Sequence, residues 1–127
     1  MKESFLVLDD LNVWIKCREL KNKLSKVARE LPAEEKYRLT DQLIRASRSI
    51  TNNIAEGYGR FHFQENIQFL RQSRGSLYEC KDHLYCALDD GYISMEKFNL
   101  LKEECSICLK ILNGYIKYLK DRKLTEQ

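Results

Sequence analysis

Residues 98–119 read FNLLKEECSICLKILNGYIKYL, and their apolar positions recur with alternating gaps of three and four. Because an α-helix has about 3.6 residues per turn, this spacing keeps the apolar side chains on one face. The series is Phe98, Leu101, Cys105, Cys108, Leu112, Tyr115 and Leu119. The stretch therefore predicts a long amphipathic helix that buries one side.

Three earlier segments repeat this period. Their apolar positions run from Val13 to Leu31, from Leu39 to Ile54 and from Leu70 to Ala87. No stretch of similar length shows the alternation of apolar and polar residues that is typical of a β-strand. Short connections make sequential helices antiparallel neighbours, so the predicted fold is an all-α, up-down-up-down four-helix bundle.

Breaks in the pattern set the expected helix ends. Pro32 suits the first turn of a new helix, and Ser94 is a suitable N-cap. Gly57 and Gly91 are expected to take positive φ at the ends of the second and third helices. The expected helices cover residues 9–31, 33–57, 63–90 and 94–121.

Composition predicts one domain over residues 1–127, with a short N-terminal arm (1–8) and a basic C-terminal tail (120–127). The chain has 127 residues with one proline and five glycines, which leaves little material for a linker or a turn-rich β fold. Residues 1–8 are too short an apolar run for a signal peptide or a membrane span. We therefore expect a cytoplasmic protein without a membrane partner.

The chain carries no recognisable catalytic or metal-binding set. It lacks a phosphate-binding glycine loop, a zinc-protease helix and a nucleophile elbow, so no catalytic residue, metal or cofactor is predicted. His62 and His83 are expected at the surface or at helix ends. Four cysteines fall on predicted core positions, where the free thiol behaves as a small hydrophobe, and this reading is favoured over a redox or zinc motif at Cys105 and Cys108. The four are Cys17, Cys80, Cys105 and Cys108.

Basic residues are unevenly distributed. Residues 36–74 contain seven Lys and Arg against three acids, and the C-terminus is basic again. Such a surface can contact the phosphates of nucleic acid. The candidates for this contact are Arg38, Arg48, Arg60, Lys117, Lys120, Arg122 and Lys123. The alternative for Arg45 and Arg74 is structural, with these two arginines paired to Glu56 or Glu79 inside the bundle.

The last predicted helix has a second apolar stripe, about 100° around from the first. It consists of Leu100, Ile107, Ile111 and Tyr118. Neighbouring helices could cover this stripe, or a partner chain could, since large exposed apolar patches are unusual on monomers. The sequence leaves both readings open and makes the stripe a candidate oligomer interface.

Residues 45–60 read RASRSITNNIAEGYGR and residues 74–79 read RGSLYE. This pair of motifs closely resembles the 23S rRNA intervening-sequence protein family, from whose usual pattern the chain departs at Ser47, Thr51 and His62. The motif positions are expected to be mainly structural, with Gly75 permitting close helix packing. They are Arg45, Ser49, Ile50, Asn53, Glu56, Gly57, Arg60, Arg74, Gly75, Ser76 and Glu79.

The resemblance implies an antiparallel four-helix bundle that assembles with itself into a ring, typically a pentamer. A distantly similar protein of diversity-generating retroelements binds a reverse transcriptase and nucleic acid through a basic surface. We therefore expect a non-enzymatic, oligomeric module whose partner is RNA, DNA or a nucleic-acid enzyme. The alternative is an assembly protein that acts through protein–protein contacts only.

Overall fold

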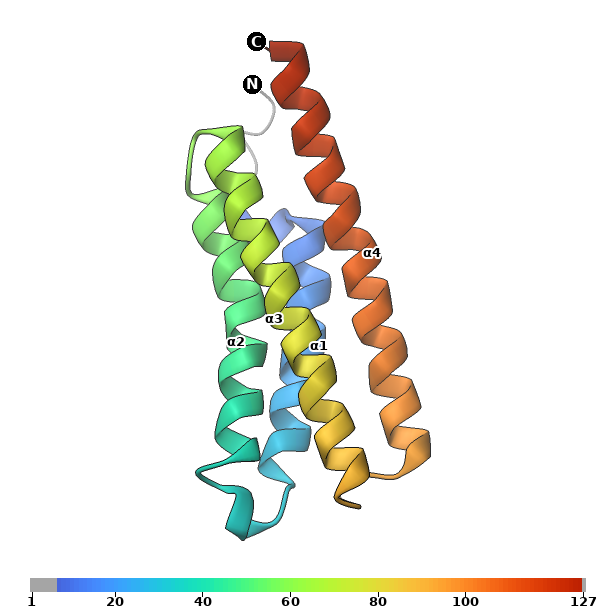
Figure 1. The fold of residues 1–127 in the computed structure, drawn as a ribbon. Coiled ribbons are helices and arrows are strands. Elements are labelled where there is room, and N and C mark those ends of the chain that lie inside the picture. Colours follow the sequence, from blue (N-terminus) through green and yellow to red (C-terminus); the bar gives the residue numbers. More distant parts are fainter. Residues whose placement is uncertain (1–6, 127) are drawn as a thin grey trace.

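The computed structural model describes residues 7–126, which form four long helices joined by short turns (Figure 1). The helices are α1 (Asn12–Arg29), α2 (Leu39–Tyr58), α3 (Phe63–Asp89) and α4 (Met95–Glu126), and the short 3-10 helices are η2 (Leu8–Asp10) and η3 (Ala33–Glu35). Neighbouring helices run in opposite directions, and α1 contacts both α2 and α4 while α3 contacts the same two. No strand occurs in residues 7–126. The predicted four-helix bundle is confirmed.

The core lies where the periodic apolar residues predicted it. Each helix contributes at least one leucine that is fully buried: Leu24, Leu43, Leu77 and Leu112. Every other position in the first apolar series of the fourth helix, from Phe98 to Leu119, is buried as well, except Tyr115, which is half-buried against the core. Burying one such leucine is worth about 1.5–3 kcal/mol, so the four stripes together hold the bundle closed.

Two helix starts differ from the prediction, because the first residues of each segment form 3-10 turns instead. Helix α1 begins at Asn12 rather than residue 9, after η2. Helix α2 begins at Leu39 rather than residue 33, after η3. Glu35 provides a reason for the second delay: its Oε1 accepts the N–H of Leu39 (3.2 Å), and its Oε2 accepts the hydroxyl of Tyr92 (2.9 Å). One side chain thus caps α2 and ties it to the α3–α4 turn.

Helix α4 is longer than predicted. It starts as expected, with the Oγ of Ser94 accepting the N–H of Lys97 (3.1 Å). It ends at Glu126 instead of residue 121, so the segment 120–126 of the predicted basic tail is helical. Figure 1 shows the last turns of α4 reaching beyond the ends of the other helices. Of the predicted arm, residues 1–6 lie outside the described residues.

The roles predicted for Gly57 and Gly75 were wrong. Gly57 lies inside α2 without a positive φ, and a Cβ there would meet the Oδ1 of Asn66 at 2.7 Å and the Cβ of Phe69 at 2.9 Å. Gly75 is exposed, and a Cβ there would meet nothing within 4 Å. Gly57, not Gly75, therefore permits close helix packing. Gly91 has the expected positive φ of 76°.

Candidate nucleic-acid and assembly surfaces

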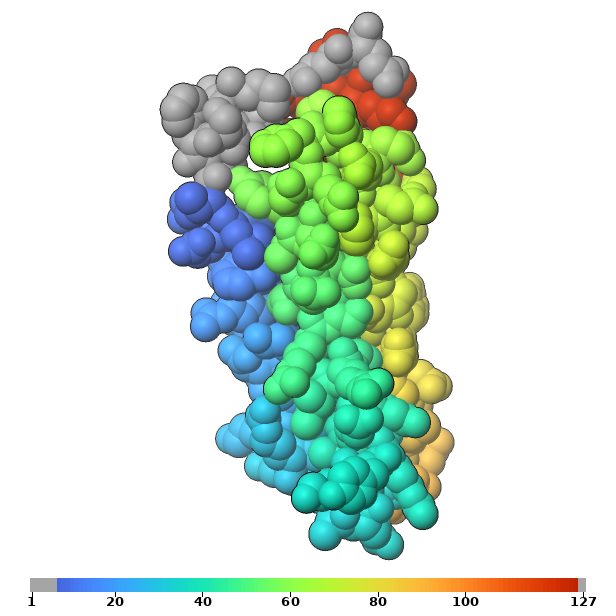
Figure 2. Space-filling model, turned by 90° about the vertical axis from the view of Figure 1, so that its left-hand side faces the viewer, coloured from blue at the N-terminus to red at the C-terminus, as the bar shows by residue number. Residues whose placement is uncertain are grey.

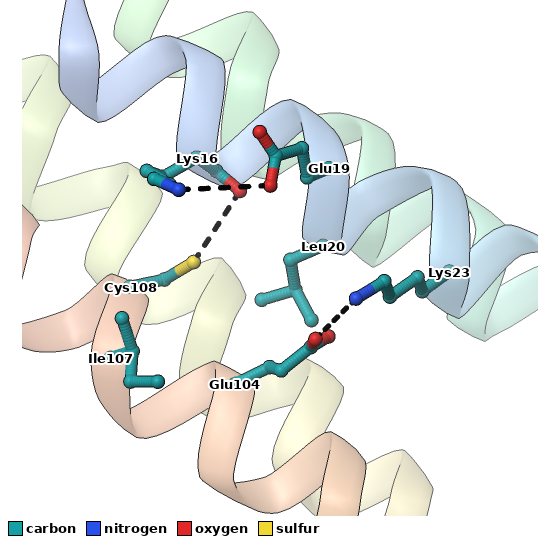
Figure 3. A pocket seen from close by; sticks show the side chains of 7 residues that line it. All are labelled: Lys16, Glu19, Leu20, Lys23, Glu104, Ile107 and Cys108. Carbon is teal, nitrogen blue, oxygen red and sulfur yellow. Dashed lines mark hydrogen bonds and ion pairs between the residues drawn. The ribbon is translucent and has the colours of Figure 1, made fainter.

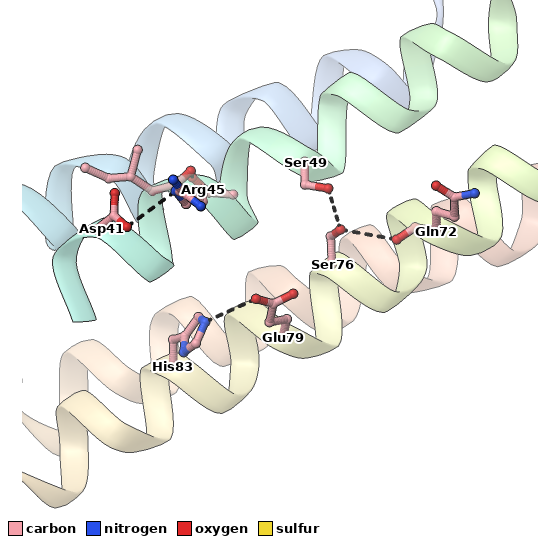
Figure 4. A network of polar contacts seen from close by, with 9 residues as sticks. Asp41, Arg45, Ser49, Gln72, Ser76, Glu79 and His83 are labelled. Carbon is pink, nitrogen blue, oxygen red and sulfur yellow. Dashed lines mark hydrogen bonds and ion pairs between the residues drawn. The ribbon is translucent and has the colours of Figure 1, made fainter. Parts of the chain in front are cut away.

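Serine hydroxyls join α2 to α3, with Ser49 and Ser76 of the sequence motif meeting between the two helices (Figure 4). The amide nitrogen of Asn53 donates to the carbonyl and the hydroxyl of Ser49, both at 2.9 Å. The hydroxyl of Ser76 lies 2.8 Å from that of Ser49, and buried Ser73 donates to the carbonyl of Ile50 (2.7 Å). These bonds satisfy polar groups at the helix seam.

The predicted internal pairing of Arg45 and Arg74 with Glu56 or Glu79 is wrong. Arg45 contacts Asp41 one turn earlier on the same helix (3.4 Å), with four-fifths of its side chain exposed. Arg74 instead reaches α4, where its guanidinium donates to the Oδ1 of Asn113 (2.9 Å). Side chains four residues apart on a helix are direct neighbours, which explains why the local partner prevails for Arg45.

The two glutamates have local partners as well. Glu56 lies 3.5 Å from Arg60, and Glu79 lies 3.5 Å from His83. His83 was expected at the surface but is buried, and its Nε2 has no hydrogen-bond partner within the described chain because the Glu79 contact lacks hydrogen-bond geometry. A histidine beside Asp82 gave no sequence signal of burial. His62 is exposed and precedes the first residue of α3, as expected for a helix end.

The outer side of α2 presents arginines to solvent. Arg38 and Arg48 are exposed, and neither pairs with an acid anywhere in residues 7–126. Arg45 lies between them, held only by the exposed Asp41. At 1.5 Å per residue the three span about 15 Å along the helix axis. We call Arg38, Arg45 and Arg48 the α2 arginine face; Figure 2 shows α2 on the outside of the bundle with α1 and α3 on its two sides.

The remaining predicted cations do not join that face. Arg60 is held by Glu56 and Glu65 (3.5 and 3.6 Å), and its guanidinium lies 5.0 Å from the ring centroid of Phe69. The others belong to the last turns of α4: Lys117 pairs with Asp121, Arg122 donates to the Tyr118 hydroxyl, Lys123 reaches Gln64 of α3, and Lys120 is exposed. Gln64 immediately precedes Glu65, the partner of Arg60, so these α4 cations and Arg60 lie at the same end of the bundle.

One further cation was absent from the predicted set. Arg71 on α3 is exposed and pairs with no acid within residues 7–126. It belongs to the arginine-rich segment that the charge distribution identified, but no motif or spacing in the sequence singled it out.

The second apolar stripe of α4 is mostly uncovered. Leu100, Ile107 and Tyr118 are 64%, 45% and 42% exposed, whereas Ile111 packs against the bundle's own core. Leu100 lines a groove of about 590 Å³ between α1 and α4, with Val27 and Leu101 as its other apolar walls. Charged residues border the groove: Lys23, Lys26, Lys97, Glu103 and Glu104. The α1–α4 seam is therefore apolar in the middle and charged at the rim.

A smaller pocket of about 120 Å³ adjoins this groove (Figure 3). Ile107 lines it, Cys108 lies at its inner side, and an ion pair between Lys23 and Glu104 bridges the two helices beside it. Among residues 7–126, no group of three or more His, Cys, Asp or Glu side chains is placed to hold a metal ion. The four core cysteines are buried, as predicted, and Cys86 is exposed.

The described helices include none that is long and apolar enough to cross a membrane.

Comparison with known proteins agrees with the sequence motifs. The family model described as 23S rRNA-intervening sequence protein matches residues 9–114. A solved structure with the same fold is the protein of unknown function from the S23 ribosomal protein family of Bacteroides thetaiotaomicron VPI-5482, with a TM-score of 0.78 and 22% sequence identity over 92% of this chain and 99% of that one. No curated protein sequence matches. With the family match covering most of the bundle, the chain belongs to the 23S rRNA-intervening sequence protein family.

Proposed function

We propose that this protein is a non-enzymatic, oligomeric module that binds the phosphate backbone of nucleic acid through the α2 arginine face. The observation that carries the proposal is the exposure of Arg38 and Arg48 without an acidic partner in residues 7–126. Arg45 adds to them, because an exposed ion pair such as the one with Asp41 is worth only about 0.2–1 kcal/mol and yields readily to a phosphate.

Arginine suits this partner. Its planar guanidinium donates two parallel hydrogen bonds to a phosphate, and it keeps its charge at every physiological pH. Such contacts position a strand without reading its bases, so little sequence preference is expected. Single-stranded RNA is the first probe to use, since the name of the matching family refers to 23S rRNA.

Assembly would multiply these weak contacts. The exposed Leu100 and Ile107 beside the α1–α4 groove supply an apolar surface of the kind that a second copy covers. Family resemblance gives the expected stoichiometry, a cyclic pentamer. Several copies of the α2 arginine face on one particle would bind a strand more tightly than one copy, because each later contact is intramolecular.

A binding titration tests the proposal. Fluorescence anisotropy would follow labelled single-stranded RNA, duplex RNA and duplex DNA at low salt. Wild type is expected to bind all three, and the double variant Arg38→Glu, Arg48→Glu to bind each about tenfold more weakly or worse. The matched control is Arg29→Glu, Lys110→Glu, which makes the same charge change at two other exposed positions. Equal losses in both double variants would overturn the assignment to α2.

Assembly through protein contacts alone is the second candidate, favoured by the same exposed Leu100 and Ile107. Light scattering coupled to size exclusion would measure the particle mass of wild type and of Leu100→Glu, Ile107→Glu. Leu124→Glu is the control, because Leu124 is 73% exposed on the same helix but does not line the groove. Loss of the oligomer in the double variant only, in a protein that binds none of the nucleic acids, would establish this alternative.

A further inference from the structure

We propose that Cys108 and Cys17 form a peroxide-reactive dithiol at the α1–α4 seam, which oxidises to a disulfide between the two helices. The sequence directed attention to Cys105 and Cys108, which are three residues apart on one helix. The structure pairs Cys108 with a different thiol, on the facing helix. The inference is independent of nucleic-acid binding.

The geometry places the Cys108 sulfur beside the backbone of α1 next to Cys17. The thiol of Cys108 points from α4 toward α1, where its sulfur lies 3.6 Å from the carbonyl oxygen of Lys16 (Figure 3). Lys16 immediately precedes Cys17, and a carbonyl oxygen lies about 2.8 Å from the next Cα, so the Cys108 sulfur is within roughly 6.5 Å of the Cys17 Cα. Cys17 and Cys108 belong to the same buried core cluster, and each thiol shifts the pKa of the other. Bridged cysteines have Cα atoms about 4.4–6.8 Å apart, so the proposed disulfide requires the α1–α4 seam to hold the Cα atoms of Cys17 and Cys108 within that range.

Access distinguishes Cys108 from the other core thiols. It lies at the inner side of the pocket of about 120 Å³ described above, which is open to solvent and large enough to admit a peroxide molecule. Cys17, Cys80 and Cys105 are fully buried, and none of them lines this pocket. A small oxidant in the pocket therefore meets Cys108 first.

The polar surroundings favour the same order of reaction. The neighbouring Cys17 thiol lowers the pKa of Cys108 below its ordinary value, against the opposing effect of burial. The neighbouring Cys108 thiol, followed by burial, raises the pKa of Cys17 and keeps it a thiol. Burial raises the pKa of Cys105 to about 12. Since the thiolate is the nucleophile, Cys108 is the attacking group and Cys17 the resolving one.

The reaction balances with hydrogen peroxide as the oxidant. The Cys108 thiolate attacks one peroxide oxygen, the O–O bond breaks, and hydroxide leaves a sulfenic acid on Cys108. The Cys17 sulfur then attacks the Cys108 sulfur, the S–O bond breaks, and the departing hydroxide takes the Cys17 proton. With the proton that Cys108 first released, the sum is two thiols and one peroxide to one disulfide and two waters.

The test is oxidation of the full chain carrying Cys86→Ser, which removes the exposed thiol and with it cross-linking between molecules. Peptide mapping by mass spectrometry after hydrogen peroxide treatment is expected to find Cys17 joined to Cys108. The rate should rise with pH as the Cys108 thiolate forms. The oxidised protein should unfold at a higher temperature, and dithiothreitol should reverse the change, because the bridge restricts the unfolded chain.

Two variants sharpen the assignment. Cys105→Ser should leave the disulfide intact, and Cys108→Ser should abolish it. Mapping in the Cys86→Ser background needs no substitution at the pair itself, so the proposal stays testable even if a core variant fails to fold. A disulfide between Cys105 and Cys108, a Cys108 sulfinic acid without any disulfide, or unreacted Cys17 and Cys108 would each overturn the proposal.

Discussion

One methyl group added at Gly57 tests the close approach of α2 and α3. In the Gly57→Ala variant the new Cβ would meet the Oδ1 of Asn66 at 2.7 Å, the Cβ of Phe69 at 2.9 Å and the carbonyl oxygen of Asn66 at 3.0 Å. The Asn66 amide can rotate away. The other two atoms are fixed to the backbone of α3, so the helices themselves must separate.

The expected magnitude follows from two opposing effects. Overpacking of this kind costs about 1–3 kcal/mol, and the backbone contacts place Gly57→Ala in the upper half of that range. Replacing a helical glycine by alanine returns about 1 kcal/mol of helix propensity. The net expectation is a loss of about 1–2 kcal/mol in the free energy of unfolding.

Urea unfolding followed by circular dichroism, at one fixed protein concentration, measures this loss. The matched controls are Gly75→Ala and Gly114→Ala, which gain the same helix propensity at sites where a Cβ meets nothing within 4 Å. Both controls should stabilise by about 0.5–1 kcal/mol. A Gly57→Ala variant as stable as Gly75→Ala would refute the close approach.

Three further substitutions probe the core and the Glu35 link. Leu77→Ala removes a fully buried side chain and should lower the free energy of unfolding by about 2–5 kcal/mol in the same urea assay. Ser73→Ala removes the bond to the Ile50 carbonyl and should cost about 0.5–1.5 kcal/mol. Tyr92→Phe removes the bond to Glu35, which raises the pKa of Tyr92 to about 12, above the value of about 10 in the unfolded chain. The bond therefore stabilises the fold fully below about pH 10, and the melting-temperature gap to wild type should close as pH rises toward 12.

Periodicity alone predicted most of the fold. The apolar series of each helix reports burial directly, because one face of a helix must be covered whatever its neighbours are. Helix ends depended on contacts that no local pattern carries: Glu35 delays α2 by bonding to Leu39 and to Tyr92, which lies 57 residues further along. A glycine can be required for a positive φ or because another helix packs too closely for a Cβ. Only the position of α3 shows that Gly57 is required for close packing.

The sequence was enough to predict which residues form the candidate surfaces. It was not enough to predict their ion-pair and hydrogen-bond partners. Charge distribution identified the basic segment, yet the partners of Arg45 and Arg74 could not be chosen from sequence, since Asp41 and Asn113 compete with the glutamates for the same donors. The apolar stripe of α4 was visible, but whether its neighbours cover it depends on how α1 and α4 meet. The pairing of Cys108 with Cys17 depends on the same seam.

The salt dependence of RNA affinity tests the central claim most directly. For single strands, the logarithm of the binding constant falls with the logarithm of salt concentration by about 0.7 for each phosphate neutralised. The account predicts that Arg38→Gln, Arg48→Gln makes this slope shallower by about 1.4 for each protomer in contact with the strand, whereas Arg29→Gln, Lys110→Gln leaves it unchanged. An unchanged slope in the Arg38 and Arg48 variant, with RNA still bound, would contradict the α2 arginine face as the phosphate-binding surface.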